Sequence, residues 1–300
     1  MTNFEPMGRD LGVNLVRRAY ATPAFHRLLP WPVALATVRV RAARLWNVPA
    51  LREHAYESMA FVLGALANDR EIEAAARRWV FETVKRDELT WRPWQTTRFP
   101  VEGAETLRHL ALAKRGAIVS FIHHGQYGGT FGSLARQGVH CNVAVLPLFF
   151  EAWKPGYDGL RDRRHIKTVT MGGTTIFSAK SCFDHMCDLL AGGGHVGIAS
   201  DLPGSAPMTV LGRRVSAASG AARLALETGA PIVPVTAHRH GEALQALVVG
   251  APIEPAGKDL PALQQAIADA HEPALRAWPE GLMEPLERWH LVVDAEASAA

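Results

Sequence analysis

The sequence predicts an α/β fold, with a central, mostly parallel sheet flanked by helices and a helical N-terminal extension. From about residue 101, short apolar, β-branched runs alternate with helical patterns. Such alternation is typical of a sheet with helices on its faces. Before that point, residues 1–95 place apolar residues at three- and four-residue spacing, and no strand-like run interrupts them. That spacing predicts helices.

The elements can be located from these patterns. The expected strands are the apolar runs at 116–122, 142–150, 195–200, 230–237 and 243–250. The expected helices between them cover 105–115, 177–193 and 216–229. The last two end in glycine, a common helix stop. We therefore predict a helical N-terminal region (1–95), one compact α/β unit (96–292) and a frayed tail (293–300), with 92–100 as a proline-containing linker.

Composition limits the class of protein. The 300 residues are 48% hydrophobic and 20% charged, as expected for a globular chain. A formal net charge of +3 gives no case for nucleic acid, although it would suit an acidic substrate or carrier. The three cysteines, Cys141, Cys182 and Cys187, form no disulfide framework and match no zinc pattern, which favours a reducing compartment. We expect Cys182 and Cys187 to be core residues of a helix.

The sequence gives no clear membrane signal. The first ten residues lack the apolar core of a signal peptide, and no run of 18 uncharged apolar residues occurs. The segment 28–46 is apolar but contains three arginines. We interpret it as an amphipathic helix packed on the domain, with a position on a membrane surface as the alternative. The expected location is cytoplasmic, and peripheral contact with the inner membrane stays open.

Polar side chains follow three of the expected strands. His123 and His124 open a glycine-rich turn after one strand, Asp201 follows another, and residues 238–240 (His-Arg-His) follow a third. Ligands of open α/β sheets bind at the carboxyl ends of the strands. Histidine is the natural proton acceptor near neutral pH, so these positions favour general acid–base chemistry over a capping role.

Other chemistries have less support. No HExxH-like spacing accompanies the histidine pair, so we expect no metal site. The GxSxG motif of the α/β-hydrolases is absent. Neither GxGxxG nor a Walker A pattern occurs, so nucleotide binding has no support.

Several blocks of sequence together resemble a known family. The turn at 121–127 (FIHHGQY) is similar to the family's His-x-Gly-Asn-Trp pattern, and 201–213 to its Asp-Gln-x-x-Gly…Phe-x-Gly stretch. The block 220–235 is the most specific, and weaker blocks lie at 101–103, 114–116, 251–253, 279–280 and 288–289. On these residues the chain resembles, over roughly 75–290, the bacterial lipid A (late) acyltransferases. These are lauroyl and myristoyl transferases of the lysophospholipid/glycerolipid acyltransferase group.

The resemblance implies a reaction and a site. An acyl group would leave a thioester, on acyl carrier protein or coenzyme A, and pass to a hydroxyl or amine, with no bound cofactor. His123 would be the general base, with His124 and Asp201 as further catalytic candidates. The candidate substrate-binding residues are Gln126, Tyr127, Phe149, Gly204, Arg213 and Arg239. Arg213, Arg214 or Arg239 would meet a pantetheine phosphate or an anionic acceptor, and Phe149 belongs to an apolar wall at 146–150 that would suit an acyl group.

The chain departs from the family at the position of its motif acid. That carboxylate stands five residues after the histidine, where this chain has Gly128 or Gly129. Three explanations are open: another carboxylate, Asp201 or Glu151, replaces it; His123 works alone; or the fold is kept only for binding. The N-terminal membrane span of many relatives is not evident either.

These departures favour a soluble relative that forms an ester or amide in specialised metabolism. The alternatives are a membrane-surface glycolipid or lipid A acyltransferase, and a catalytically silent protein that binds an acyl carrier or lipid.

Overall fold

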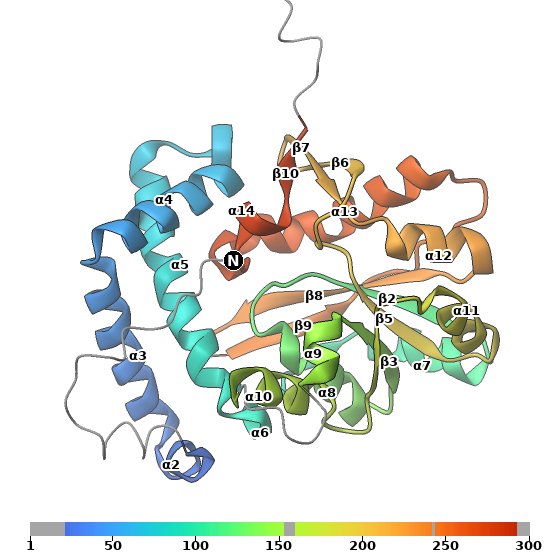
Figure 1. Cartoon of the computed structure of the whole chain (residues 1–300), viewed down its shortest axis with the longest axis horizontal. Helices are drawn as coiled ribbons and strands as arrows, with labels where there is room; N and C mark the ends of the chain where they lie inside the picture. The colour runs from blue at the N-terminus through green and yellow to red at the C-terminus, as the bar shows by residue number, and fades with distance from the viewer. Residues whose placement is uncertain (1–21, 153–159, 242–243, 293–300) are drawn as a thin grey trace, which may run out of the picture.

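The computed structural model describes residues 22–152, 160–241 and 244–292. These residues form a seven-stranded sheet of order β1-β9-β8-β2-β5-β3-β4 and a three-stranded sheet of order β10-β7-β6 (Figure 1). In the large sheet β8, β2, β5, β3 and β4 are parallel, and β9 runs antiparallel to β8. The predicted α/β fold, with a mostly parallel sheet and a helical N-terminal region, is confirmed.

The large sheet consists of β1 (Val101–Glu102), β2 (Ala117–Phe121), β3 (Cys141–Val145), β4 (Thr175–Ser178), β5 (His195–Ala199), β8 (Ile232–His240) and β9 (Leu244–Val249). All five residues of β2 are buried. A strand covered on both faces has no solvent side, so its sequence is a continuous apolar run without alternation. The central strands were therefore recognisable as apolar runs.

Helices cover both faces of this sheet. On one face, α11 (Phe183–Ala191), α12 (Gly220–Thr228) and α13 (Leu260–Ala277) pack with Ile118 and Val196. On the other, α7 (Ala104–Leu112) and α8 (Thr130–Arg136) pack with Val119 and Phe121. Successive strand residues point to opposite faces, so Ile118 and Val119 belong to different layers.

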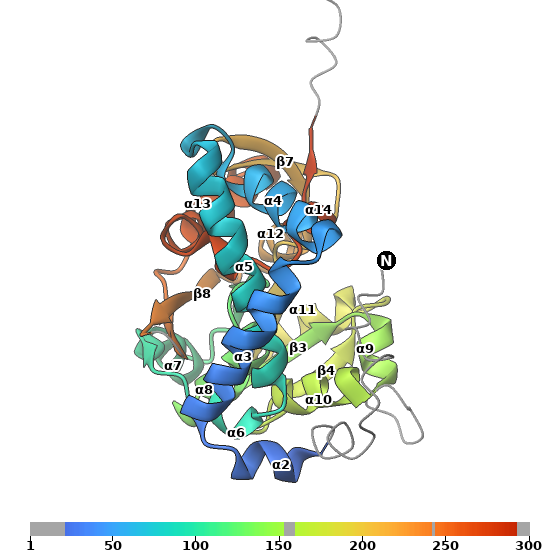
Figure 2. The same ribbon diagram turned by 90° about the vertical axis from the view of Figure 1, so that its left-hand side faces the viewer.

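The N-terminal region is built from α2 (Pro23–Leu28), α3 (Trp31–Trp46), α4 (Pro49–Leu63), η1 (Gly64–Leu66), α5 (Asp69–Thr90) and α6 (Pro93–Thr96). A capping box between Asn68 and Glu71 fixes the start of α5. Figure 2 shows α3 lying along α5. The indole Nε1–H of Trp79 on α5 donates to the carbonyl of Leu282 at 2.8 Å, which ties this region to the α/β part.

Several expected boundaries were wrong. The apolar run 142–150 is split, because β3 ends at Val145 and Pro147 begins the helix α9 (Pro147–Glu151), where proline is favoured in the first turn. The first residues of the expected helix 177–193 belong to β4, and α11 begins at Phe183. The linker 92–100 contains α6, and Thr96 and Phe99 in it are buried.

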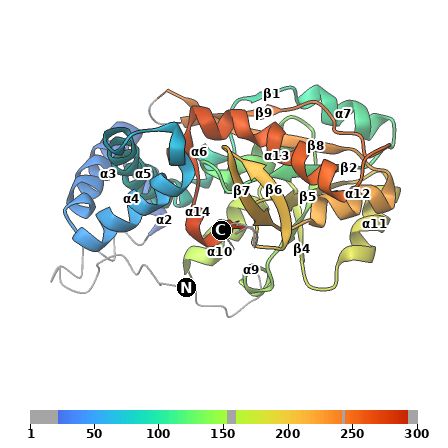
Figure 3. The same ribbon diagram turned by 90° about the horizontal axis from the view of Figure 1, so that it is seen from above.

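A hairpin and several helices were not anticipated. The hairpin joins β6 (Ala206–Val210) to β7 (Arg213–Ala217) through Leu211 and Gly212, both with positive φ, and it lies against α13 (Figure 3). Positive φ at both central residues suits the right-handed twist of paired strands. The remaining elements are η2 (Tyr127–Gly129), α10 (Leu160–Val169), η3 (Pro279–Gly281), α14 (Pro285–Arg288) and β10 (His290–Leu291).

The apolar segment near the N-terminus is a helix of the folded N-terminal region. The segment 28–46 contains the whole of α3, whose residues Ala34, Leu35 and Val38 are buried. Within the described ranges, no helix combines the length and apolar character needed to cross a membrane. The predicted tail, 293–300, and the start of the helical region, 1–21, lie outside the described residues.

Candidate active site

The register of two parallel strands brings His123 and Asp201 together. Phe121, the last residue of β2, pairs with Ala199, the last residue of β5. His123 and Asp201 each lie two residues further along, at the same carboxyl edge of the sheet. Two residues that are 78 positions apart in sequence are thus adjacent because their strands end level with each other.

Two hydrogen bonds join these residues. The backbone N–H of His123 donates to Oδ2 of Asp201 at 2.8 Å, and ring Nδ1 lies 2.8 Å from Oδ1. An ionised carboxylate only accepts, so Nδ1 carries the proton and Nε2 is the basic nitrogen. No hydrogen bond links Nε2 to the described part of the chain. The His123 side chain is 12% exposed and that of Asp201 is fully buried. Nε2 is therefore the open end of a His–Asp pair.

Arg288 of α14 touches the same imidazole. Its Nη1 lies 3.0 Å from Nδ1 of His123, while its Nε donates to the carbonyl of Met283 at 2.8 Å. A guanidinium only donates, and the Nδ1 proton is directed at Asp201. The Arg288–His123 contact is therefore a close approach of a cation to the ring and not a second hydrogen bond. It disfavours a positive charge on the imidazole.

The pKa values of the pair follow from these surroundings. Burial lowers the pKa of His123; Asp201 raises it, and the cations Arg288 and Arg86 lower it further. Burial by itself would raise the pKa of Asp201, but His123 and Arg288 outweigh that effect and hold this pKa at about 2. At neutral pH the pair is a neutral imidazole hydrogen-bonded to a carboxylate, which is the state a general base needs.

A short ladder supports the turn that carries His123. Gly125 N–H donates to the carbonyl of Gly281 at 2.9 Å, and Met283 N–H donates to the carbonyl of His123 at 2.9 Å. Arg86 of α5 caps this ladder, since its Nε donates to Gly125 O at 3.1 Å and its Nη2 to Gly281 O at 3.0 Å. The site is thus held between α5 and the segment after α13.

Gly128 and Gly129 have little room for a side chain. A Cβ atom at Gly128 would lie 3.0 Å from Cε1 of His165 on α10, so the ring of His165 takes the space of a side chain. At Gly129 a Cβ would lie 2.1 Å from the carbonyl oxygen of Thr96. Of the two carboxylates considered as substitutes, Asp201 is bonded to His123, whereas Glu151 lies at the end of α9.

Two neighbours of His123 in the turn, His124 and Tyr127, pack against different rings. His124 is buried, its Nε2 lies 2.7 Å from Trp278 O, and burial lowers its pKa to about 4. It contacts Trp278 and not Asp201, so the structure gives it a packing position. The ring of Tyr127 meets that of His123 edge-on, with centroids 4.3 Å apart. Burial raises the pKa of Tyr127 to about 12, so its phenol stays protonated.

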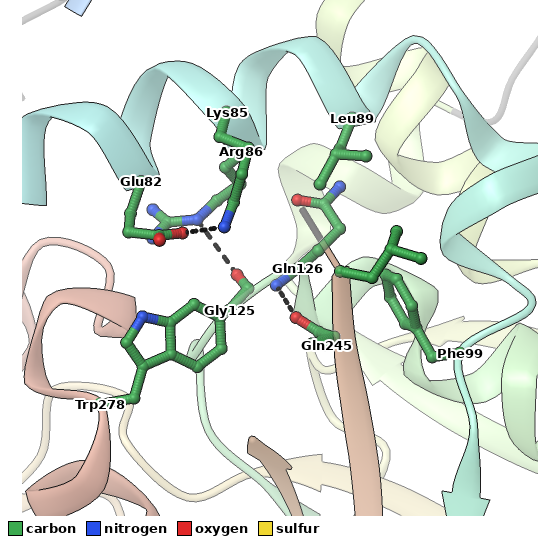
Figure 4. A pocket seen from close by; sticks show the side chains of 10 residues that line it. Glu82, Lys85, Arg86, Leu89, Phe99, Gly125, Gln126, Gln245 and Trp278 are labelled. Atoms are coloured by element: carbon green, nitrogen blue, oxygen red, sulfur yellow. Dashed lines mark hydrogen bonds and ion pairs between the residues drawn. The ribbon is translucent and has the colours of Figure 1, made fainter. Parts of the chain in front are cut away.

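Gln126 points into a small cavity beside α5 (Figure 4). Its backbone N–H donates to Oε1 of Gln245 at 2.6 Å, and Lys85 and Trp278 also line the cavity. The cavity measures about 10 Å³, which is room for one water and not for an acyl chain. His123 does not line this cavity. Phe149 of α9 lies near this site, 5.5 Å from the ring of His165, which in turn lies 5.1 Å from that of Tyr127.

The contacts of the other predicted binding residues are to groups other than His123. Arg213 donates to Ala60 O at 3.1 Å and ties the β6–β7 hairpin to α4. Arg239 pairs with Glu280 at 3.4 Å, and β8 continues to His240, so residues 238–240 belong to the strand and do not follow its end. Gly204 packs against the end of β7, where a Cβ would lie 2.5 Å from Ala217 O.

The arginines that do approach the pair are Arg86 and Arg288, and neither was given a role in the site from the sequence alone. The only signal was the block at 288–289, which was similar to the family's C-terminal element. Nothing in the local sequence of Arg86 separates it from the other arginines of a charged helix.

No protein-family model matches the chain, and no curated protein matches it. The residues present define the chemistry. In the described ranges, no group of three or more His, Cys, Asp or Glu side chains is arranged to hold a metal ion. A neutral imidazole oriented by a buried carboxylate can take a proton from a hydroxyl or amine that attacks an electrophile.

Proposed function

We propose that this protein is an acyltransferase that moves an acyl group from a thioester to an amine or hydroxyl acceptor. The donor would be an acyl-CoA or an acyl-phosphopantetheine carrier protein. The observation that carries the proposal is the His123–Asp201 pair, with Nε2 open at the carboxyl edge of a parallel sheet. The resemblance of 121–127 and 220–235 to the lipid A acyltransferases supports the same assignment.

In the proposed reaction, Nε2 of His123 accepts the proton of the acceptor O–H or N–H as that oxygen or nitrogen attacks the thioester carbonyl. A tetrahedral intermediate forms, and the imidazolium is stabilised by Asp201. The intermediate then collapses, the C–S bond breaks, and the departing thiolate takes the proton from Nε2. The products are an ester or amide and a free thiol, and His123 is again neutral.

We propose that Asp201 has the role of the motif carboxylate that Gly128 cannot supply. Both the backbone N–H and the Nδ1–H of His123 point at it, and it is fully buried. This difference from the family also motivates the proposal that the acceptor belongs to specialised metabolism and is not ordinary lipid A.

The test is thiol release from a panel of acyl-CoA and acyl-carrier thioesters, with and without amine and alcohol acceptors. We expect acceptor-dependent release that falls by roughly 10²–10⁴-fold in His123→Ala. His109→Ala, on the exposed surface of α7, is the matched control and should retain activity. Binding of thioesters without turnover in the wild type would favour the alternative of a silent carrier- or lipid-binding protein.

A second candidate is an acyltransferase that works on a glycolipid at a membrane surface of the cytoplasm. It is favoured by exposed apolar residues of the first helices, since Leu28, Val33 and Val40 are 83%, 48% and 53% exposed. Arginines lie on the same segment, as in helices that rest in a lipid interface. Sedimentation with anionic vesicles should then weaken in Val33→Ser/Val40→Ser, and no sedimentation of the wild type would reject this candidate.

A further inference from the structure

We propose that Arg86 and Arg288 form a binding site for an oxyanionic group of a substrate, a phosphate or a carboxylate, beside His123. The proposal deepens the proposed function and rests on it, because the bound group is taken to be part of the acyl donor or of the acceptor. It replaces Arg213, Arg214 and Arg239, the arginines that the sequence analysis suggested for this purpose.

The two guanidinium groups lie at the two ends of one short ladder. Arg86 donates to the carbonyls of Gly125 and Gly281, and Arg288 donates to that of Met283 and contacts the ring of His123. The backbones of His124 and Leu282 pair antiparallel between them. Two residues of extended chain span about 7 Å. The charge of Arg288 also lowers the pKa of Arg86, as expected for two cations near the same ladder.

Each guanidinium keeps donors for a ligand. Arg86 uses Nε and Nη2 for its hydrogen bonds to the described part of the chain. Arg288 uses Nε and Nη1 for its contacts. Nη1 of Arg86 and Nη2 of Arg288 make no hydrogen bond to the described part of the chain, and neither atom is fully buried. Guanidinium forks are well matched to phosphate and carboxylate oxygens.

The local charge is not balanced. Arg86 has no carboxylate within 4.0 Å among the described residues, and the nearest to Arg288 is Asp201, at 3.8 Å from its Nε. Asp201 already accepts two hydrogen bonds from His123. Two further carboxylates act on Arg86 from a distance: Glu82 is paired with Lys85, and Glu284 is exposed to solvent. The site therefore contains two guanidinium groups, and the one carboxylate close to them, Asp201, is already hydrogen-bonded to His123.

Tyr127 adds a neutral donor to the same place. Its ring contacts His123, and both Arg86 and Arg288 act on its phenol electrostatically. Its hydroxyl makes no hydrogen bond to the described residues and is not fully buried. An anion at the site would meet two guanidinium groups and one phenol, next to the nitrogen that takes the acceptor's proton.

The test measures binding of inorganic phosphate and of acetate to the full chain, by calorimetry and by NMR of the His123 ring. We expect at least one of the two anions to bind and to raise the pKa of His123, because its negative charge offsets Arg288. Phosphate binding would assign a phosphate-bearing substrate, and acetate binding alone a carboxylate-bearing one. Arg288→Gln should weaken the affinity at least tenfold, and Arg86→Lys should weaken it less because the charge is kept.

The control is Arg276→Gln, an exposed arginine of α13 that pairs with Glu272. It should bind the anion as the wild type does. Arg86→Gln provides a second test if Arg288→Gln does not fold. No binding of either anion to the wild type, or equal binding in folded Arg288→Gln and wild type, would overturn the proposal. Neither outcome depends on turnover, so failure here is distinct from failure of the proposed acyl transfer.

Discussion

Asp201 accepts hydrogen bonds from both the backbone N–H and the ring Nδ1–H of His123, each at 2.8 Å. One carboxylate thus fixes the end of β2 and the orientation of the imidazole at the same time. We expect a conservative substitution at Asp201 to change the tautomer of His123 while leaving the fold intact.

Asp201→Asn should reduce kcat by about 10²–10⁴-fold while the protein stays folded. An amide can present its NH₂ to Nδ1, which favours the tautomer with the proton on Nε2 and removes the base. Steady-state kinetics and circular dichroism measure the two effects separately. Asp188→Asn, on the exposed surface of α11, is the control. A fully active Asp201→Asn protein would mean that His123 works without a carboxylate.

The pH dependence of kcat/KM should have an acid limb below the ordinary histidine pKa of 6.5. Burial lowers the pKa of His123, so the ring becomes a base at lower pH than a free histidine does. Because Arg288 lowers this pKa and Asp201 raises it, Arg288→Gln should shift the limb to higher pH and Asp201→Asn to lower pH. Rate profiles over roughly pH 5 to 8, the range in which histidine changes its charge, test both directions. Identical limbs in all three proteins would contradict the assignment of His123.

Stability should fall as pH decreases from about 6.5 to about 4. Burial lowers the pKa of His124 and of His271 to about 4, while an unfolded histidine titrates near 6.5. The unfolded chain therefore binds protons first, and the contribution that is fully present above pH 6.5 is lost through this window. One pKa unit corresponds to about 1.4 kcal/mol, so the loss amounts to several kcal/mol for the pair.

Urea unfolding at a series of pH values measures this loss. His271→Gln should flatten the profile, because the ring that contacts Ser120 at 2.9 Å is then absent. His109→Gln, an exposed control on α7, should leave the slope as it is. Asp201, with a pKa of about 2, loses its contribution only below about pH 4 and so does not obscure the result.

A carboxylate placed at position 128, as in the motif that the turn resembles, should destabilise this protein. In Gly128→Asp the new Cβ meets the ring of His165, and such overpacking costs about 1–3 kcal/mol. The double variant Gly128→Asp/His165→Ala should recover part of the lost thermal stability. Gly220→Asp makes the same change where no atom lies within 4 Å, so its melting temperature should stay near that of the wild type. Higher activity in Gly128→Asp would show that the motif position is still functional.

The sequence was sufficient to locate the strands that are covered on both faces, because such strands require continuous apolar runs. It was also sufficient to place His123 and Asp201 at the carboxyl ends of β2 and β5, since each directly follows one of those runs. The β6–β7 hairpin was missed because its residues do not form an apolar run, and Arg213 and Arg214 lie inside it. Pro147 ended β3 within a run that had no other polar break.

The arginines of the site could not be inferred in this way. Arg86 lies on α5 and Arg288 on α14, 39 and 165 residues from the histidine turn that they contact. Their positions beside the turn come from tertiary packing, through the ladder that pairs His124 with Leu282. No pattern of period 2 or 3.6 carries that information.

That ladder sets an order in which the site can be assembled. A chain growing from a ribosome contains His123 and Asp201 well before it contains Gly281, Met283 and Arg288. Until residue 288 is made, the chain contains His123, Asp201 and Arg86 but not the second arginine of the proposed anion site. The carbonyls of Gly281 and Met283, to which the two guanidinium groups donate, are also among the last parts of the site to be synthesised.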